Sequence, residues 1–370
     1  PAIHSGITAL IQPYSAYAFR PGPHRSVWLR NMYASGSVAY IALGAAVLAG
    51  FLSGTTAVVF TLLTALVFAI TVGLADPHYM DLVAEAAPAD LRGRFFGLRV
   101  IFLGLGGVVG GELAEWVLGA AAPPQNFGAS LCVGGVLYVL CTQALRRFQD
   151  PPVPTPEPLP AGSFSRYLGG SLGPLALHPR FRGLLGSFVC FALAVAVFPF
   201  LANFVRDRLG AEAGVLGTLG GLVMAGNVVL AGPLGQACDR FGSRATLAGV
   251  LVCYGAALLL CVTLTDRFSL YAAYFLASIW MPGLFVPATK LVMELGAADE
   301  ANPVSPAEST ALMMAAMAPS RILGPVAAGF ALDRVPPASV FLTGVALALV
   351  SVAILLAGGN WTGRPRHSQN

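Results

Sequence analysis

Several ionisable side chains of this sequence lie inside long apolar runs, where a charge is energetically costly. Arg321 lies near the middle of the run 308–331, and Glu112 and Glu115 lie one helical turn apart in the run 96–119. A charge near the centre of a bilayer costs at least ~2.5 kcal/mol on insertion scales. Each of these residues therefore needs a chemical reason to be there.

Two kinds of chemistry can explain these charges. Arg321 can bind an anionic group of a solute, or it can pair with a buried carboxylate. A buried carboxylate can also exchange a coupling proton near neutral pH. Glu112 is the better proton candidate, because Glu115 lies closer to the end of its run, where water reaches it. For Arg321 and Glu112 alike, a structural role is the alternative.

A third polar group occurs in the run 56–86, where Asp76, His78 and Tyr79 surround Pro77. Proline lacks a backbone N–H and bends a helix, so we expect a bend at this point. Asp76 is a candidate carboxylate for a solute or a proton. The alternative is a structural cap at the bend, since Asp-Pro is a common turn pair.

The sequence lacks the residue patterns that metal binding, disulfide bonding or catalysis would require. The six cysteines and five histidines are scattered, without CxxC spacing or a Cys/His cluster, so neither a metal site nor a disulfide framework is indicated. A phosphate-binding loop and a nucleophile–base pair are also missing. We therefore predict no enzyme activity, no catalytic residue and no cofactor.

The composition indicates the elements that hold these residues. Of the 370 residues, 56% are apolar and 10% are charged, and the mean hydropathy is +0.75. Soluble domains carry about 25% charged residues, so most of this surface is expected to face the lipid bilayer. Runs that can span a bilayer lie at 3–19, 33–52, 56–86, 96–119, 126–145, 184–205, 213–236, 243–264, 268–295, 308–331 and 337–358. The predicted fold class is an all-α polytopic membrane protein with about eleven transmembrane helices.

Two internal alignments indicate a duplicated architecture. The segment LIQPYSAYAFRPG from Leu10 aligns with LAGPLGQACDRFG from Leu230, an offset of 220 residues. Gly106–Gly111 likewise aligns with Gly324–Gly329 at an offset of 218. Nearly equal offsets favour two pseudo-symmetric bundles over chance similarity between glycine-rich helices. The same offset puts the partner of the first helix after the linker before residue 1, so we expect twelve helices in the complete fold, with the first absent here.

A proline-rich segment divides the two bundles. Six prolines lie between 151 and 160, so this segment cannot form a regular helix and is expected to be a semi-rigid linker. The predicted organisation is an N-terminal bundle over 1–148, a linker over 149–183, and a C-terminal six-helix bundle with a short tail over 184–370.

The distribution of basic residues predicts the orientation. Fifteen arginines, Arg99 among them, are assigned to the side of the linker and the C-terminal tail, and four to the other side. Because basic loops stay in the cytoplasm, we expect a cytoplasmic linker and C-terminus, in the inner membrane of a bacterium. Basic residues confined to short loops do not indicate nucleic-acid binding.

The strongest local pattern is Gly235-Gln-Ala-Cys-Asp239-Arg240-Phe-Gly242-Ser-Arg244, between two predicted spans. Its glycines allow a tight turn, and its Asp and Arg side chains can cap helix ends and pair across helices. The pattern resembles the signature loop of the major facilitator superfamily, G-x-x-x-D-R-x-G-[RK]-[RK], with Ser243 as the only departure. In that family the loop is thought to latch the two halves, so the resemblance implies a conformational switch here.

The first-half copy of this loop is degraded. Arg20 and Gly22 are retained and belong to the predicted switch, but Ser15 replaces the first glycine and Phe19 replaces the acid. The loss of the acid puts a latch from the N-terminal half in doubt.

Two further patterns are similar to the same family. Pro88 to Arg94 resembles the P-x-x-x-R-G turn between the fourth and fifth helices, and Gly106–Gly111 resembles the antiporter motif G-P-x-x-G-G with Gly107 in place of proline. The second resemblance favours efflux by antiport. Plain packing of small residues between helices is its alternative.

The resemblance also implies where a solute binds. In this family the first, fourth, seventh and tenth helices line a central cavity, which holds Asp76 on the fourth, Asn203 on the seventh and Trp280 on the tenth. The predicted substrate and coupling residues are Asp76, His78, Tyr79, Glu112, Asn203, Trp280 and Arg321. A cavity with so few charges favours an amphipathic or hydrophobic solute.

The sequence therefore predicts a monomeric secondary transporter that moves a small solute by alternating access, with protons as the coupling ion and efflux as the favoured direction. The alternative is a membrane sensor or scaffold that keeps the fold without transport. The degraded loop at Phe19 supports this alternative.

Overall fold

The computed structural model describes residues 2–19, 24–52, 54–88, 90–147, 163–169, 179–210, 215–297 and 305–357, and over these residues the regular structure is entirely helical. The elements before the linker are α1 (Ala2–Ala18), α2 (Arg25–Leu48), α3 (Gly54–Ala86), α4 (Arg92–Gly119), α5 (Gln125–Thr142) and the 3-10 turn η1 (Gln143–Arg147). The later elements are α6 (Phe164–Tyr167), α8 (Pro179–Val195), α9 (Phe198–Arg208), α10 (Val215–Phe241), α11 (Ser243–Thr263), α12 (Arg267–Ala277), α13 (Trp280–Gly283), the π-helical turn η3 (Leu284–Ala288), α14 (Thr289–Ala297), α15 (Pro306–Leu332) and α16 (Pro337–Ala357).

The predicted all-α membrane fold is confirmed. Within the described residues, ten helical segments are long and apolar enough to cross a membrane. The predicted run 3–19 corresponds to α1, which has 17 residues. Pro77 does not end α3, which continues through it as one helix.

Prolines interrupt two of the predicted spans. The run 184–205 is divided into α8 and α9 by a turn just before Pro199. The run 268–295 is divided into α12, α13, η3 and α14, with Pro282 in α13 and Pro287 in η3. Proline has no N–H to donate, and its ring clashes with the carbonyl four residues earlier. Turns of π-helix are frequent at functional sites, so η3 is a natural place to look for one.

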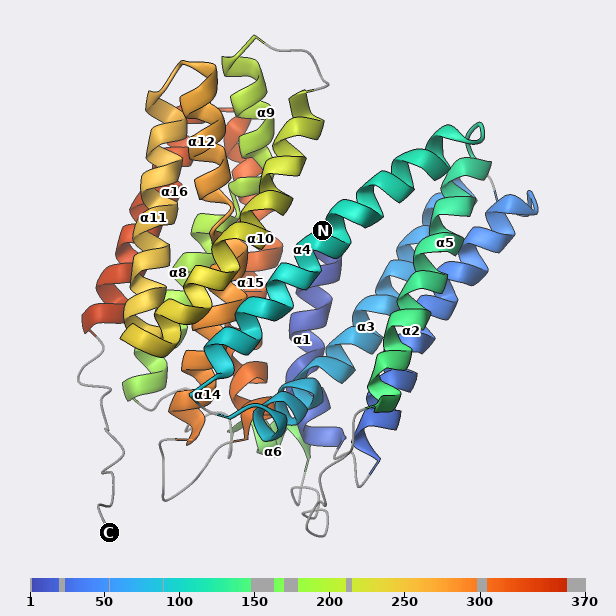
Figure 1. The fold of residues 1–370 in the computed structure, drawn as a ribbon, viewed down its shortest axis with the longest axis horizontal. Helices are drawn as coiled ribbons and strands as arrows, with labels where there is room; N and C mark the ends of the chain where they lie inside the picture. The colour runs from blue at the N-terminus through green and yellow to red at the C-terminus, as the bar shows by residue number, and fades with distance from the viewer. Residues whose placement is uncertain are drawn as a thin grey trace.

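Two bundles make up the fold. Helices α1–α5 form the N-terminal half and α8–α16 form the C-terminal half (Figure 1). The halves meet mainly through α4 with α10 and α1 with α15, and also through α3 with α15 and α4 with η3. We call the end at which α4, α11 and α15 begin the linker-side end, because α6 also lies there. The ribbons of the two halves lie close together at this end and diverge toward the other end (Figure 1).

Glycines allow α4 to lie directly against α10 near the linker-side end. A Cβ atom on Gly97 would meet the carbonyl oxygen of Ala231 at 2.7 Å, and one on Gly93 would meet that of Gly235 at 2.7 Å. An added Cβ at Gly111, further along the same face of α4, would meet no atom of the described residues within 4 Å. The close contact of α4 with α10 therefore ends before Gly111.

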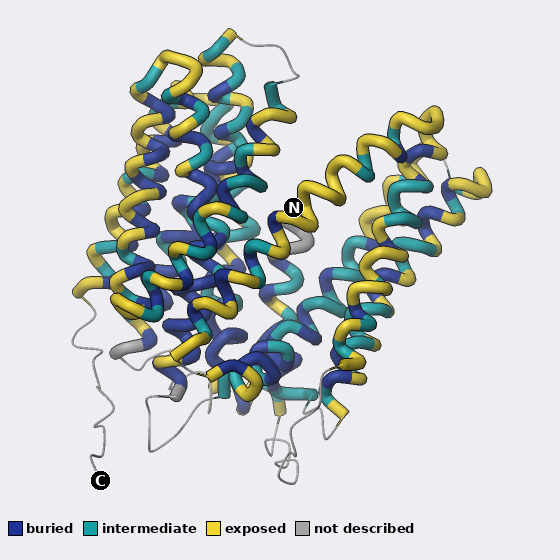
Figure 2. Tube along the Cα trace, in the orientation of Figure 1, coloured by how far each residue is buried: buried dark blue, intermediate teal, exposed yellow. Residues whose placement is uncertain are grey.

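The C-terminal half has the larger buried core. The most apolar stretch of α3 is 17% buried, whereas that of the α8–α9 segment is 56% buried. The tube in Figure 2 is accordingly exposed over much of α4 beyond its contact with α10. Lipid tails are as apolar as leucine side chains, so a bilayer accommodates this exposed surface.

Candidate functional site

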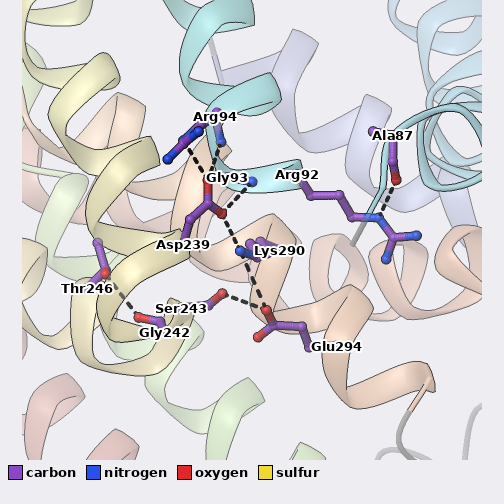
Figure 3. Close-up of polar contacts among 10 residues, drawn as sticks. All are labelled: Ala87, Arg92, Gly93, Arg94, Asp239, Gly242, Ser243, Thr246, Lys290 and Glu294. Carbon is purple, nitrogen blue, oxygen red and sulfur yellow. Dashed lines mark hydrogen bonds and ion pairs between the residues drawn. The ribbon is translucent and has the colours of Figure 1, made fainter. Parts of the chain in front are cut away.

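The predicted conformational switch lies at the linker-side end and contacts the other half (Figure 3). The carboxylate of Asp239, near the end of α10, accepts hydrogen bonds from the backbone N–H groups of Gly93 at 3.2 Å and Arg94 at 3.1 Å. These are the second and third residues of α4, and such N–H groups have no partner within their own helix. A carboxylate of the C-terminal half thus caps the first turn of a helix of the N-terminal half.

Lys290 completes this contact from α14. Its Nζ atom lies 2.5 Å from Asp239 Oδ1, and the two side chains are only 5% and 9% exposed. Glu294 lies 3.9 Å from the same ammonium group and accepts a hydrogen bond from Ser243 at 3.1 Å. Removing one member of a buried ion pair leaves an uncompensated charge, so Asp239 and Lys290 depend on each other.

The other residues of the signature loop fix the turn itself. Gly242 has a φ of +85°, a backbone conformation that favours glycine, and joins α10 to α11. Arg244 donates hydrogen bonds to the carbonyl groups of Leu355 at 2.8 Å and Leu356 at 2.7 Å, at the end of α16. The Arg240 guanidinium stacks over Phe241 at 5.2 Å. The predicted switch residues Arg20 and Gly22 lie outside the described residues.

A second contact between the halves was not predicted. Asp81 of α3 accepts a hydrogen bond from the backbone N–H of Ala307 at 2.8 Å, in the first turn of α15. Ser305 and Glu308 also form a capping box at this end of α15, and Tyr167 of α6 donates to Glu308 at 3.1 Å. A carboxylate of the N-terminal half therefore caps a helix of the C-terminal half.

A polar group inside the N-terminal half contains Asp76. The Tyr33 hydroxyl of α2 donates to Asp76 Oδ1 at 2.8 Å, and the carboxylate is half-buried. The positive charge of Arg99 acts on Asp76, Tyr33 and Tyr138. The Arg99 guanidinium itself lies 4.9 Å from the centre of the Tyr79 ring.

Arg99 joins this group to the other half. Its guanidinium also lies 5.9 Å from the ring of Phe285, in the π-helical turn η3. Arg99 is predicted to lie in the basic loops, and this prediction is wrong: the residue belongs to α4 and is half-buried between the halves. Residues near the end of an apolar run carry no local signal that separates a loop from the interior, so spacing alone could not find it.

The remaining predicted site residues do not join this group. His78 is buried, with its ring edge-on to Trp28 at 5.1 Å. Asn203 is exposed on α9. Trp280 packs 5.7 Å from Phe198, and its buried Nε1 atom has no acceptor among the described residues.

The predicted charged residues Glu112 and Arg321 have different surroundings. Glu112 is exposed, so the burial on which its predicted proton role rested is absent. Arg321 is half-buried, and its Nη1 atom contacts Met314 Sδ at 3.6 Å. Leu323 and Phe330 are exposed on the opposite side of α15, so Arg321 faces the interior of the protein. Among the described residues, no carboxylate forms an ion pair with Arg321.

Comparison with known proteins agrees with this architecture. The sequence model described as Major Facilitator Superfamily matches residues 183–369. The chain belongs to the major facilitator superfamily. It is therefore a member of a family of secondary transporters and not of an enzyme family. No curated protein sequence matches the chain.

Solved structures of this superfamily are similar over nearly the whole chain. The fucose:proton symporter FucP of E. coli superposes with a TM-score of 0.64 and 14% identity, covering 97% of this chain and 95% of FucP. The proton:xylose symporter XylE gives 0.67 and 13%, covering 96% and 83%. A bacterial homologue of the iron transporter ferroportin, in an outward-facing state, gives 0.68 and 15%, covering 96% and 88%. At these identities the likeness establishes the shared fold.

Proposed function

We propose that this major facilitator moves a small amphipathic solute by alternating access, with a proton as the coupling ion. The observation that carries the proposal is the pair of reciprocal caps at the linker-side end. Asp239 of the C-terminal half caps α4, and Asp81 of the N-terminal half caps α15. Both caps hold the halves together at the end where they meet.

The strength of such contacts suits a reversible closure. A carboxylate at a helix N-terminus contributes about 0.3–1 kcal/mol, and up to ~2 kcal/mol when partly buried. Conformations separated by a few kcal/mol remain interconvertible, and a ligand shifts them by its difference in affinity. Two caps of this size can therefore hold one state without preventing the other.

Asp76 is the proposed proton site. It is a half-buried carboxylate that already shares a hydrogen bond with Tyr33, and a positive charge at Arg99 acts on it. The exposed Glu112 has no such surroundings. Two structural neighbours are named proton symporters, which is consistent with proton coupling.

The aromatic residues near Asp76 bear on the class of solute, and the antiporter-like motif bears on the direction of transport. Tyr33, the hydrogen-bond partner of Asp76, begins a row of aromatic rings, with Tyr33 6.5 Å from Tyr138 and Tyr138 5.4 Å from Phe68, so a solute with an apolar body fits these surroundings. Gly107, which stands in place of the proline of the antiporter motif, packs against Met224 of α10. We therefore propose proton coupling without a fixed direction, and efflux remains a prediction from the motif. The excess of basic residues favours a cytoplasmic linker side, in a bacterial plasma membrane.

Reconstitution tests this proposal. The purified chain is placed in liposomes that contain a pH-sensitive dye, and a panel of small solutes is added with and without a pH gradient. We expect some solutes to move protons across the membrane, and Asp76→Asn to abolish that movement. Glu112→Gln is the matched control, because this carboxylate is exposed, and it should leave proton movement unchanged. Solute binding without any movement of solute or protons would contradict transport and favour the sensor alternative.

A further inference from the structure

We propose that Arg99 binds the anionic group of the solute, so that the site takes up an organic acid together with one proton. The inference rests on the proposed function and names the solute class for the same site. Its starting point is a guanidinium that lies between the two halves, in contact with Tyr79 of α3 and Phe285 of η3.

The Arg99 guanidinium has an unused hydrogen-bond donor. Its Nη1 atom is buried, and within the described part of the chain no acceptor lies within hydrogen-bond distance. A buried polar group without a partner costs about 1–3 kcal/mol, and more when it is charged. The rings of Tyr79 and Phe285 compensate the positive charge in part, but they accept no directed hydrogen bond. A carboxylate fits this donor best, because its two oxygens match the fork of a guanidinium.

One face of α4 leaves an open approach to this group. Gly106 and Gly110 follow Arg99 at seven and eleven residues, which places all three on the same face of the helix. A Cβ atom at Gly106 or at Gly110 would meet no described atom within 4 Å. The face of α4 that packs on α10 differs, because an added Cβ at Gly104 would meet Val228 at 2.6 Å. No described atom therefore packs against this face of α4 at Gly106 and Gly110, two and three turns beyond Arg99.

Asp76 links this anion site to a proton. The titratable groups on which the positive charge of Arg99 acts are Asp76 and the hydroxyls of Tyr33 and Tyr138. The ring of Tyr79 lies beneath the guanidinium. Tyrosine hydroxyls are uncharged near neutral pH, so among these described groups only Asp76 can balance the arginine charge. When Asp76 takes up a proton, Arg99 is left without a counter-charge, and a solute anion can supply it. One proton and one monoanion then bind together, and the loaded site has the same net charge as the empty site.

Arg321 is the alternative candidate for binding the anionic group of the solute. It is also half-buried and faces the interior, but it forms no ion pair with a carboxylate among the described residues. An anion bound at Arg321 would therefore not be linked to the protonation of a nearby carboxylate. The two arginines lie in different halves, on α4 and α15, and can be tested separately.

The test is a binding screen on the purified full chain. Small aromatic monocarboxylic acids, each with its neutral amide as a control, are assayed by the shift in thermal unfolding temperature. Titrations at about pH 6 and about pH 8, where such acids stay ionised, give their affinities. We expect acids to stabilise the protein and amides to have little effect. Affinity should rise as the pH falls, by up to about tenfold per pH unit when one proton is taken up with each anion.

Variants assign this binding to residues. Arg99→Gln should abolish the response to acids, whereas Arg99→Lys should keep part of it, because the charge remains and only the fork is lost. Asp76→Asn should bind acids at both pH values with equal affinity. Arg321→Gln should behave as the wild type. Retained fluorescence and melting behaviour of Arg99→Lys serves as the check that the site still folds.

Several outcomes would overturn the inference. Amides that bind as well as acids, acid binding that survives Arg99→Gln, or acid binding that is lost in Arg321→Gln would each do so, as would a complete lack of response to acids at both pH values. If neutral solutes drive proton movement through Asp76 while acids fail to bind, the proposed transport function stands and only the anion site is rejected.

Discussion

Asp239 and Asp81 each cap a helix of the opposite half at the linker-side end, but they differ in the number of contacts that hold them. Asp239 accepts from Gly93 and Arg94 and pairs with Lys290, and the Asp239 and Lys290 side chains are nearly buried. Among the described residues, Asp81 has one hydrogen-bond partner in the other half, the N–H of Ala307, on a helix that already has its own capping box. The C-terminal half therefore holds the stronger latch, and the N-terminal half contributes a weaker one from a different helix.

This difference explains how a degraded loop is tolerated. Phe19 stands where the signature loop has its acid, and its ring packs 5.7 Å from Trp28. The N-terminal half nevertheless presents a carboxylate to the start of α15, supplied by α3 through Asp81. What matters physically is an acceptor at the free N–H groups of a helix, whichever helix supplies it.

The largest effect is expected from Asp239→Ala. The substitution uncaps α4 and leaves Lys290 buried without its partner, and breaking a buried pair in this way costs about 3–5 kcal/mol. Thermal unfolding of the purified protein measures the loss. The double variant Asp239→Ala, Lys290→Met should recover part of it, because no charge is left unpaired. A double variant as unstable as the single one would show that the pair is not coupled.

A smaller effect is expected from Gly97→Ala. The new Cβ would approach the carbonyl oxygen of Ala231 at 2.7 Å and force α4 away from α10. Overpacking of this kind costs about 1–3 kcal/mol. The matched control is Gly110→Ala on the same helix, where the added Cβ meets open space. Equal melting temperatures for the two variants would contradict the close approach of the halves.

Asp81→Ala should have a weaker effect than either. It removes one acceptor from the start of α15, and loss of such a cap costs about 0.5–2 kcal/mol. The capping box of Ser305 and Glu308 remains and should hold the loss near the lower end. A destabilisation equal to that of Asp239→Ala would reverse the proposed ranking of the two latches.

The smallest effect is expected from Glu85→Gln. Glu85 pairs with Arg25 at 2.8 Å within the N-terminal half, but its side chain is 41% exposed. Exposed ion pairs contribute about 0–1 kcal/mol. The melting temperature should therefore change little, and transport should be unaffected. A loss of transport in this variant would indicate that Glu85 belongs to the latch, which the contacts do not support.

Local sequence patterns were sufficient to predict the helices and the signature loop. Apolar runs specify spans because a bilayer sets their length, and the turn at Gly242 and the capping role of Asp239 follow from neighbouring residues. The partners of Asp239 could not be predicted in the same way. Lys290 lies 51 residues away along the chain, and Asp81 contacts Ala307 across 226 residues.

The polar group around Asp76 could likewise be predicted only in part from local sequence. Asp76 was identified because a carboxylate inside an apolar run is conspicuous. Arg99 was misplaced because it lies near the start of its helix, among other arginines. Its contacts come from α3 and from a π-helical turn in the other half, so only tertiary structure reveals them.

The central claim is that the halves separate at the linker-side end during transport, and Cys238 offers a direct probe. This native cysteine is 1% exposed, beside Asp239 in the contact between the halves. Cys261, fully buried in the core of the C-terminal half, is the control. Maleimide labelling rates are compared in single-cysteine variants in liposomes, in the wild-type and Asp239→Ala backgrounds. We predict that Asp239→Ala, and solute with a pH gradient in the wild type, speed labelling of Cys238 and leave Cys261 protected. Protection of Cys238 equal to that of Cys261 under every condition would contradict alternating access through this latch.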